Sequence, residues 1–407
     1  MTHRSRSFAA SKKKLGKPTA KGKPKKLHHP PARNALASKG DDEASDAESD
    51  DAEPEADPVP PAAALAAPSD EDVLDVIRAA LGPALSSPSF TADVQKAKGL
   101  LYEKQWLELF TNAALLDAYA GRWVPSRALC FRDLMAGIRD VRALFVGEEQ
   151  DEEGDEEEEE EGGAANDGDA DADAESKPGP SAADPAAPAP AHILSIGGGA
   201  GSELLAVAAL AHSAQLLSRP APLAWTSLDI GDWGGVLTRL GNAARSEWSL
   251  PPSVSFTYTQ ADVLAPAADP LASLPPPALT TIFFTLTELL AQSRPRTAAL
   301  LRSITARTPP GGLLLVADSA SDIAEFALGK DGRTWPVYMV LDALLLRADP
   351  GSWERVRAED SRWFRLGEGV GADWPCKLEN ARYWMRLYRR KDKEADAKEA
   401  PEAPTEQ

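Results

Sequence analysis

The chain has 407 residues and a formal net charge of −19, but residues 148–175 alone contain 17 acidic side chains and no basic one. The rest of the chain is close to neutral. Local basic patches, rather than total charge, attract nucleic acids, so the total charge neither favours nor excludes a nucleic-acid substrate. Two cysteines exclude a disulfide framework, and no apolar run approaches the roughly 18 residues that span a bilayer, so we expect a soluble intracellular protein without a membrane partner.

Eight of the lysines in the first 40 residues lie between Lys12 and Lys26, and no acidic residue precedes Asp41. Such a segment cannot bury enough apolar surface to fold. Clustered lysines are typical of a nuclear or nucleolar address or of an RNA-contacting arm, and a solvated tail without a partner is the alternative. An acidic stretch and an Ala/Pro linker follow. We therefore predict that residues 1–68 are disordered and that the protein is nuclear and nucleolar, with a cytoplasmic pool as an open alternative.

A helical layer is predicted over residues 69–146. Ser69 is a suitable N-cap, and three acidic residues follow it in the first turn of a helix that Gly82-Pro83 should end. The apolar spacing remains helical from residue 90 to residue 145, with Pro125 marking a helix start. Residues 147–190 are acidic and then rich in Ala and Pro, which predicts a disordered insert. The insert is either a solvated spacer or a segment that mimics RNA or contacts a basic protein.

Beyond His192, short apolar runs alternate with helical stretches, as in a parallel sheet covered on both faces. Strands are predicted at 193–196, 224–228, 254–259, 280–284, 313–317, 363–366 and 381–388. Helices are predicted at 202–217, 234–244, 297–306, 323–328 and 338–346. The fold class is therefore α/β, with a mostly parallel core domain over residues 191–390 and a disordered tail over residues 391–407.

A glycine-rich loop, Gly197-Gly198-Gly199-Ala-Gly201, lies between the first of these strands and the helix that follows it. Without β-carbons the backbone turns tightly and approaches a ligand closely, and the N–H groups at the helix start present partial positive charge. The G-x-G-x-G spacing is that of S-adenosylmethionine enzymes, whereas the dinucleotide fingerprint would need a glycine at Ser202. The loop therefore favours a methyl donor over NAD as cofactor, with a structural turn as the alternative.

Two acidic residues stand at the ends of the second and third predicted strands. Asp229 is placed to accept hydrogen bonds from the ribose hydroxyls of a nucleoside. Asp262 is placed to meet the adenine amino group, and we expect the apolar neighbours Ile230 and Val263 to contact the same cofactor. Either acidic residue alone could be an ordinary strand-end cap, but their order after the glycine loop supports a cofactor site.

Histidines and cysteines do not gather in the sequence. His192 and His212 flank the first predicted strand and helix, and the other three histidines lie in the N-terminal tail. With two distant cysteines and no cluster of histidines and acids, we expect neither a Ser-His-Asp hydrolase nor a metal site.

Several blocks together resemble the fungal S-adenosylmethionine-dependent methyltransferase family that includes the 25S rRNA uridine-N3-methyltransferase. The blocks are residues 90–132, Ser195-Ile-Gly-Gly-Gly-Ala-Gly-Ser-Glu, Leu228-Asp-Ile-Gly-Asp-Trp, Phe284-Thr-Leu-Thr-Glu-Leu and residues 374–389. The resemblance implies a Rossmann-like class I methyltransferase acting on a uridine in large-subunit ribosomal RNA or a pre-ribosomal particle. Its general pattern has Asp or Glu at the position of Ser195. A hydroxyl can still hydrogen-bond there, but direct recognition of the cofactor by a carboxylate is lost.

The acceptor side of the site is expected at the end of the fourth strand. There Thr285 would contact the cofactor, and Thr287 and Glu288 are the catalytic candidates, with Glu288 as general base. Loss of the N3 proton of uridine must accompany methylation, so a carboxylate within hydrogen-bond reach would help. The alternative is that Glu288 only caps the next helix or orients a loop.

N3 lies on the pairing edge of uridine, so the base must be unpaired or extruded. Aromatic and basic residues are the usual means of holding such a base. The candidates for RNA contacts are Arg122, Trp123, Arg127, Trp374, Lys377 and Arg382. The alternative functions are methylation of a protein or small molecule, and a non-catalytic ribosome-assembly factor that keeps the fold as an RNA-binding scaffold.

Overall fold

The computed structural model describes residues 68–146, 190–216, 221–265, 269–321, 323–327, 333–348 and 350–392. The lysine-rich tail, the acidic insert and the last residues of the chain lie outside this range. The predictions made for them above therefore stay predictions.

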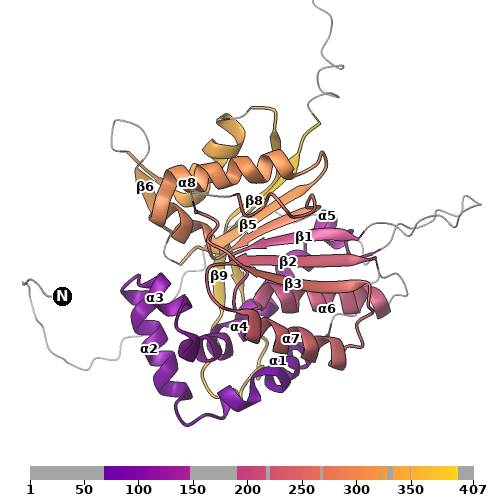
Figure 1. Ribbon diagram of the computed structural model, residues 1–407, viewed down its shortest axis with the longest axis vertical. Helices are drawn as coiled ribbons and strands as arrows, with labels where there is room; N and C mark the ends of the chain where they lie inside the picture. The colour runs from indigo at the N-terminus through magenta and orange to yellow at the C-terminus, as the bar shows by residue number, and fades with distance from the viewer. Residues whose placement is uncertain are drawn as a thin grey trace, which may run out of the picture. The chain divides into compact units, whose positions relative to one another are not determined.

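Seven strands form one sheet in the order β3-β2-β1-β4-β5-β9-β8 (Figure 1). The strands are β1 (Ala191–Ile196), β2 (Leu223–Asp229), β3 (Val254–Gln260), β4 (Leu279–Phe283), β5 (Leu313–Ser319), β8 (Trp353–Phe364) and β9 (Ala381–Arg390). β1 to β5 pair in parallel, and β9 and β8 extend the sheet in antiparallel fashion. The predicted mostly parallel sheet is confirmed. Between β1 and β4 the strand order reverses, and the crevice outside the carboxyl ends at such a point is the usual ligand site of open α/β sheets.

The nine helical segments of the described residues cover both faces of the sheet. They are α1 (Asp70–Leu85), α2 (Phe90–Tyr102), α3 (Trp106–Phe110), α4 (Ala113–Ala136), α5 (Arg139–Arg142), α6 (Ser202–Leu216), α7 (Gly234–Glu247), α8 (Leu286–Arg307) and α9 (Val337–Asp342), and a π-helical turn, η1 (Ala343–Arg347), continues α9. One apolar core joins the sheet to α1, α4, α6 and α7, and a second core joins its other face to α8, α9 and η1 (Figure 1). Successive side chains of a strand point to opposite faces of the sheet, so each strand contributes to both cores. Ile193, for example, lies in the first core and Leu194 in the second.

Helix α6 is apolar around nearly its whole circumference and is almost entirely buried. A helix of this kind needs partners on all sides. The sheet covers one side of α6, and α4 from the N-terminal layer packs along it as well. The N-terminal helices therefore share a hydrophobic core with the sheet.

The prediction that Pro125 begins a helix was wrong. Asn112 caps α4 by accepting from the Ala114 N–H at 3.2 Å, and the helix runs through Pro125 to Ala136. A proline inside a helix leaves the carbonyl four residues earlier without its usual donor. That carbonyl belongs to Gly121, and the Trp374 indole N–H donates to it at 2.9 Å. A residue from the far end of the chain thus makes this long helix possible.

Other boundaries also differ from the sequence prediction, and β8 begins ten residues before the strand predicted at 363–366. Helix α1 does not end at Gly82-Pro83 but continues to Leu85. Pro83 has no N–H to donate to the carbonyl of Ala79, and the helix tolerates this because Ala79 is exposed to water. The segment predicted as a helix from residue 323 instead contains β6 (Glu325–Ala327), which pairs with β7 (Thr334–Pro336). Helix α8 begins eleven residues before the predicted start and bends at Ser293, just before Pro295.

Candidate functional site

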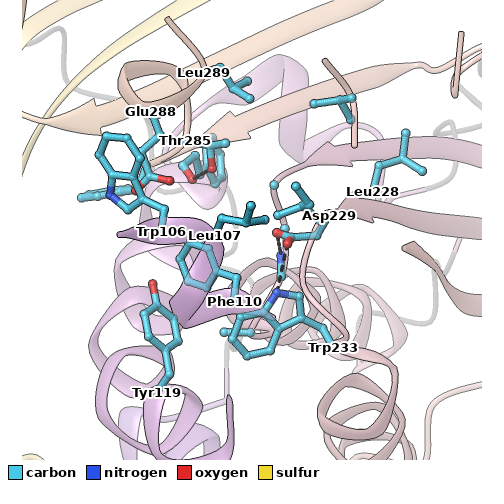
Figure 2. A pocket seen from close by; sticks show the side chains of 18 of the residues that line it. Trp106, Leu107, Phe110, Tyr119, Leu228, Asp229, Trp233, Thr285, Glu288 and Leu289 are labelled. Atoms are coloured by element: carbon cyan, nitrogen blue, oxygen red, sulfur yellow. Dashed lines mark hydrogen bonds between the residues drawn. The ribbon is translucent and has the colours of Figure 1, made fainter. Parts of the chain in front are cut away.

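A cavity of about 760 Å³ opens at the carboxyl edge of the sheet, where the strand order reverses. Its floor comes from the loops after β1, β2, β3 and β4, and its opposite wall from α3 and α4 (Figure 2). Sites for small molecules and cofactors commonly have this size and a mostly apolar lining with a few polar groups. All predicted cofactor residues except Ser195 line it.

The glycine loop between β1 and α6 requires its glycines. Gly197 and Gly201 have φ angles of +74° and +99°, which side chains rarely allow. A Cβ at Gly197 would lie 2.5 Å from Thr285, and one at Gly199 would lie 2.5 Å from a carboxylate oxygen of Asp229. The loop backbone consequently forms part of the cavity surface, where it can approach a ligand closely.

Asp229 ends β2 and is fixed by three N–H donors. The backbone N–H of Gly199 donates to one oxygen at 3.0 Å, and the backbone N–H of Gly231 and the Trp233 indole donate to the other at 2.8 and 3.0 Å (Figure 2). Burial raises the pKa of the carboxyl, and the donated hydrogen bonds oppose that shift. The carboxylate links the glycine loop to the loop after β2, and its remaining lone pairs are available to a ligand hydroxyl.

Glu203, which the sequence analysis overlooked, lines the cavity from the first turn of α6 and is 3% exposed. One oxygen of its carboxyl accepts hydrogen bonds from the hydroxyls of Ser195 and Thr281, the latter at 2.7 Å. Burial raises its pKa to about 7 in spite of these donors. Ser195 itself offers no carboxylate, but Glu203 brings one to the neighbouring position from the next helix. The signal was present in the sequence, as an acidic residue two positions after the last loop glycine.

The loop after β3 contributes Asp262 and Val263 to the cavity, and the loop after β2 contributes Ile230. Asp262 is exposed and accepts the Leu264 backbone N–H at 2.8 Å. These three residues and Asp229 form one continuous side of the cavity. A nucleoside could lie there between apolar side chains and polar oxygens.

The turn from β4 into α8 forms the opposite end of the cavity. Phe284 has a φ of +53°, a strained conformation for a bulky residue, and its backbone N–H donates to the Ala317 carbonyl at 2.8 Å. This turn brings Thr285 and Glu288 to the cavity (Figure 2). The Arg127 guanidinium lies 5.2 Å from the centre of the Phe284 ring and also lines the cavity.

The Glu288 carboxyl, which lines the cavity, has a pKa well above its usual range. Its pKa is raised to about 8, mainly by burial and also by the nearby Asp318, while Arg127 opposes both. Perturbed carboxyls of this kind cluster at functional sites. Thr287, also predicted to be catalytic, does not line the cavity; its backbone N–H donates to Asp318 at 2.9 Å. We therefore assign Thr287 to positioning Asp318.

An aromatic wall faces the sheet edge. Phe110 and Tyr119 meet edge to face with ring centres 5.4 Å apart, and Tyr119 lies 5.6 Å from Trp233. The Arg127 guanidinium donates to the Tyr119 hydroxyl at 3.0 Å. Trp106 and Phe110 point into the cavity from α3 (Figure 2). Helical periodicity identified these side chains only as apolar, so their place at the site was missed.

The predicted RNA contacts do not form one group. Arg122 is 3% exposed and pairs with Glu379 at 2.5 Å, and Trp374 is 6% exposed and donates to α4, so both are structural and cannot serve as RNA contacts. Trp123 is half-buried and stacks on Tyr119 with ring centres 4.5 Å apart. Lys377 is exposed and Arg382 half-buried, and both lie near the β9–β8 end of the sheet. Of the six, Arg127 alone lines the cavity.

The fold and the cavity are those of a nucleotide-binding α/β enzyme, and sequence comparison identifies the family. Residues 77–389 match the family described as "Putative SAM-dependent methyltransferase", and the chain belongs to this family. It is a methyltransferase that uses S-adenosylmethionine. A curated relative, the 25S rRNA (uridine(2843)-N(3))-methyltransferase of Saccharomyces cerevisiae, is 25% identical over 324 residues, which are 73% of this chain and 77% of the yeast protein.

Solved structures show weaker similarity. The N-methyltransferase NodS from Bradyrhizobium japonicum WM9 has 13% identity and a TM-score of 0.28, covering 50% of this chain and 86% of that chain. CrArsM, an arsenic (III) S-adenosylmethionine methyltransferase from Chlamydomonas reinhardtii, has 15% identity and a TM-score of 0.31, covering 50% of this chain and 64% of that chain.

Among the described residues, no group of three or more His, Cys, Asp or Glu side chains is arranged to hold a metal ion. No helix within the same residues is long and apolar enough to cross a bilayer.

Proposed function

We propose that this chain methylates N3 of a uridine in large-subunit ribosomal RNA, with Glu288 as the general base. The observation that carries the proposal is a carboxyl with a raised pKa at the acceptor end of the cavity, beside Arg127 and Phe284. The yeast relative, whose name states this reaction, supports the choice of substrate. In this proposal the protein acts in the nucleus and nucleolus, and its substrate is ribosomal RNA or a pre-ribosomal particle.

The residues of the cavity fit S-adenosylmethionine, which when bound supplies a methyl group carried on a sulfonium. In this proposal the glycine loop and Asp229 hold the ribose and its neighbouring atoms, and Asp262 and Val263 hold the adenine. Glu203 would accept the ammonium group at the methionine end, because a buried carboxylate gains most from a cationic partner. Ser195 and Thr281 orient Glu203 and do not touch the ligand.

The acceptor base would lie between the aromatic wall and Glu288. In its ionised form Glu288 takes the N3 proton and later releases it to water. A base whose pKa lies near the working pH is efficient, because a useful fraction is ionised and the ionised form is strongly basic. Arg127 is placed to stabilise negative charge that develops on the uracil oxygens during transfer.

The test is methyl transfer by the purified full chain to transcribed fragments of large-subunit ribosomal RNA, followed by mass spectrometry of the nucleosides. We expect 3-methyluridine as the product. A methylated nucleoside of another kind would contradict the assignment of N3. Calorimetry with S-adenosylhomocysteine runs in parallel. Normal cofactor binding without transfer to any RNA would point to a protein or small-molecule acceptor, or to a non-catalytic scaffold.

A further inference from the structure

A second surface at the same edge of the sheet has the chemistry of a nucleic-acid contact. Its centre is Trp363, near the end of β8, which is 52% exposed. All ten tryptophans of the chain are described by the structure, and the other nine are buried or half-buried. A tryptophan gains much free energy from burial, so one left on an edge strand requires an explanation.

Two guanidinium groups flank the exposed indole. The guanidinium carbons of Arg382 and Arg365 lie 5.7 Å and 6.0 Å from the centre of the Trp363 ring. Arg382 is directly opposite Trp363 in the β8–β9 pair and donates to the Ser361 hydroxyl at 2.8 Å. A guanidinium that lies over an aromatic ring holds the ring in position, and with both arginines in place Trp363 is still 52% exposed.

These two arginines differ in their ion pairing from other arginines near them. Earlier in β8, Arg355 pairs with Asp342 at 2.8 Å, and Arg357 pairs with Glu359 at 2.6 Å. Within the part of the chain that the structure describes, neither Arg365 nor Arg382 pairs with a carboxylate. Arg362, the neighbour of Trp363 in β8, also pairs with Glu359 at 3.3 Å. Of the arginines near the indole, the two without a described carboxylate partner are those beside its ring, one just after β8 and one on β9. Unpaired guanidinium groups next to an exposed ring are complementary to phosphates next to a base.

The position of this surface relates it to the methyl-transfer site. Tyr383, next to Arg382, is opposite Ser319 at the carboxyl end of β5, and the neighbouring Asp318 accepts the Thr287 N–H beside Glu288. A shallow hollow extends from Ser321, just after β5, to Trp363 and Lys377. The tryptophan and the catalytic cavity thus lie along one edge of the same sheet.

We propose that Trp363, Arg365, Arg382 and Lys377 form a platform for a single-stranded nucleotide of the RNA that flanks the target base. An unpaired base stacks on the Trp363 indole, and the two arginines and the lysine bind the adjacent phosphates. This inference rests on the proposed RNA substrate and adds a binding site outside the cofactor cavity. Its role is to hold the strand so that the target base reaches the cavity.

The first test measures RNA binding by the full chain and its Trp363→Ala and Trp363→Phe variants. The probes are a single-stranded oligouridylate, a fully paired RNA of equal length and a transcribed fragment of large-subunit ribosomal RNA. We expect Trp363→Ala to weaken binding of the single strand roughly 10-fold, since stacking on an aromatic side chain contributes about 1–3 kcal/mol per base. Trp363→Phe should recover part of the loss, and the paired RNA should show no change.

The second test separates phosphate contacts from packing. Each lost contact of an arginine with a single strand should reduce the slope of log affinity against log salt by about 0.7. We therefore expect Arg365→Gln/Arg382→Gln to reduce the slope, whereas Arg355→Gln, which removes a paired arginine from β8, should not. The N-terminal lysines are present in every variant and cancel in these comparisons.

S-adenosylhomocysteine affinity and the thermal midpoint should equal those of the wild type in every variant of the platform. If the wild type binds and methylates the RNA but Trp363→Ala is unaffected, the platform is refuted while the proposed function stands. If the wild type binds no RNA, the proposed function fails and the platform fails with it. Equal weakening on paired and single-stranded RNA would refute stacking on Trp363.

Discussion

Glu203→Gln is the substitution that tests the cavity most sharply. The change keeps the size of the side chain and an oxygen that accepts from Ser195 and Thr281, and it removes only the ability to ionise. In the folded chain the pKa of this carboxyl is raised from 4.5 to about 7, mainly by burial. The folded state therefore holds the proton more tightly than the unfolded state, and the wild type loses stability as pH rises between these two values.

The loss of stability on ionising Glu203 can be calculated from the shift of its pKa. Each pKa unit corresponds to about 1.4 kcal/mol, so ionising Glu203 in the fold costs up to about 3 kcal/mol by pH 8. Glutamine does not ionise, so the variant avoids this cost. We expect similar unfolding free energies for variant and wild type near pH 4.5, and a variant more stable by up to about 3 kcal/mol at pH 8.

The assay is urea unfolding of both proteins without cofactor across this pH range, with the exposed Glu247→Gln as a control for loss of an ordinary surface carboxylate. In parallel, calorimetry should show that the wild type binds S-adenosylmethionine more tightly as pH rises from 5 to 7, because the ionised Glu203 is the form that attracts an ammonium group. The variant should bind more weakly and without this rise. Stability curves that stay parallel across the pH range would refute a buried ionisable Glu203, and unchanged cofactor affinity would remove it from the ligand site.

Four other predictions follow from the site and the tail. Gly199→Arg should abolish cofactor binding in calorimetry, because a Cβ there already overlaps Asp229 and Trp233, and retained affinity would contradict the role of the loop. Asp229→Ala should weaken cofactor binding about 10- to 150-fold by removing hydrogen bonds worth roughly 1.5–3 kcal/mol, and Asp229→Asn should do so less because it retains an acceptor. Glu288→Gln should keep cofactor affinity and slow single-turnover methylation by on the order of 10²–10⁴-fold. The wild-type rate should level off above about pH 8, whereas the variant's rate should continue to rise as N3 ionises in solution; equal rates would show that the proton goes elsewhere. A fluorescent fusion lacking residues 1–40 should lose nucleolar accumulation, and unchanged accumulation would mean that another part of the chain directs it.

The sequence by itself determined the parallel half of the sheet and most of the cofactor side of the site. β1, β4 and β5 lie inside the sheet and are buried on both faces, which makes them recognisable as short, mostly apolar runs, whereas the edge strand β3 is recognisable by its alternation of apolar and polar residues. The glycine loop, Asp229 and Asp262 could be found for a related reason. Carboxyl ends of parallel strands meet at one edge, so polar residues that follow successive strands converge even when they are far apart in sequence.

Tertiary structure alone decided what depends on contacts between distant segments. Pro125 could remain inside α4 because Trp374, about 250 residues later, donates to the freed carbonyl of Gly121, and the same contact makes Trp374 structural. Glu203 became the buried carboxylate of the cavity because Ser195 and Thr281 come from neighbouring strands that lie beside α6. Trp363 came to lie beside Arg382 because β8 pairs with β9 at the end of the sheet. Local sequence patterns show which residues are apolar and which are polar. The topology of the chain decides which polar groups come into contact, and these contacts decide the role of each residue.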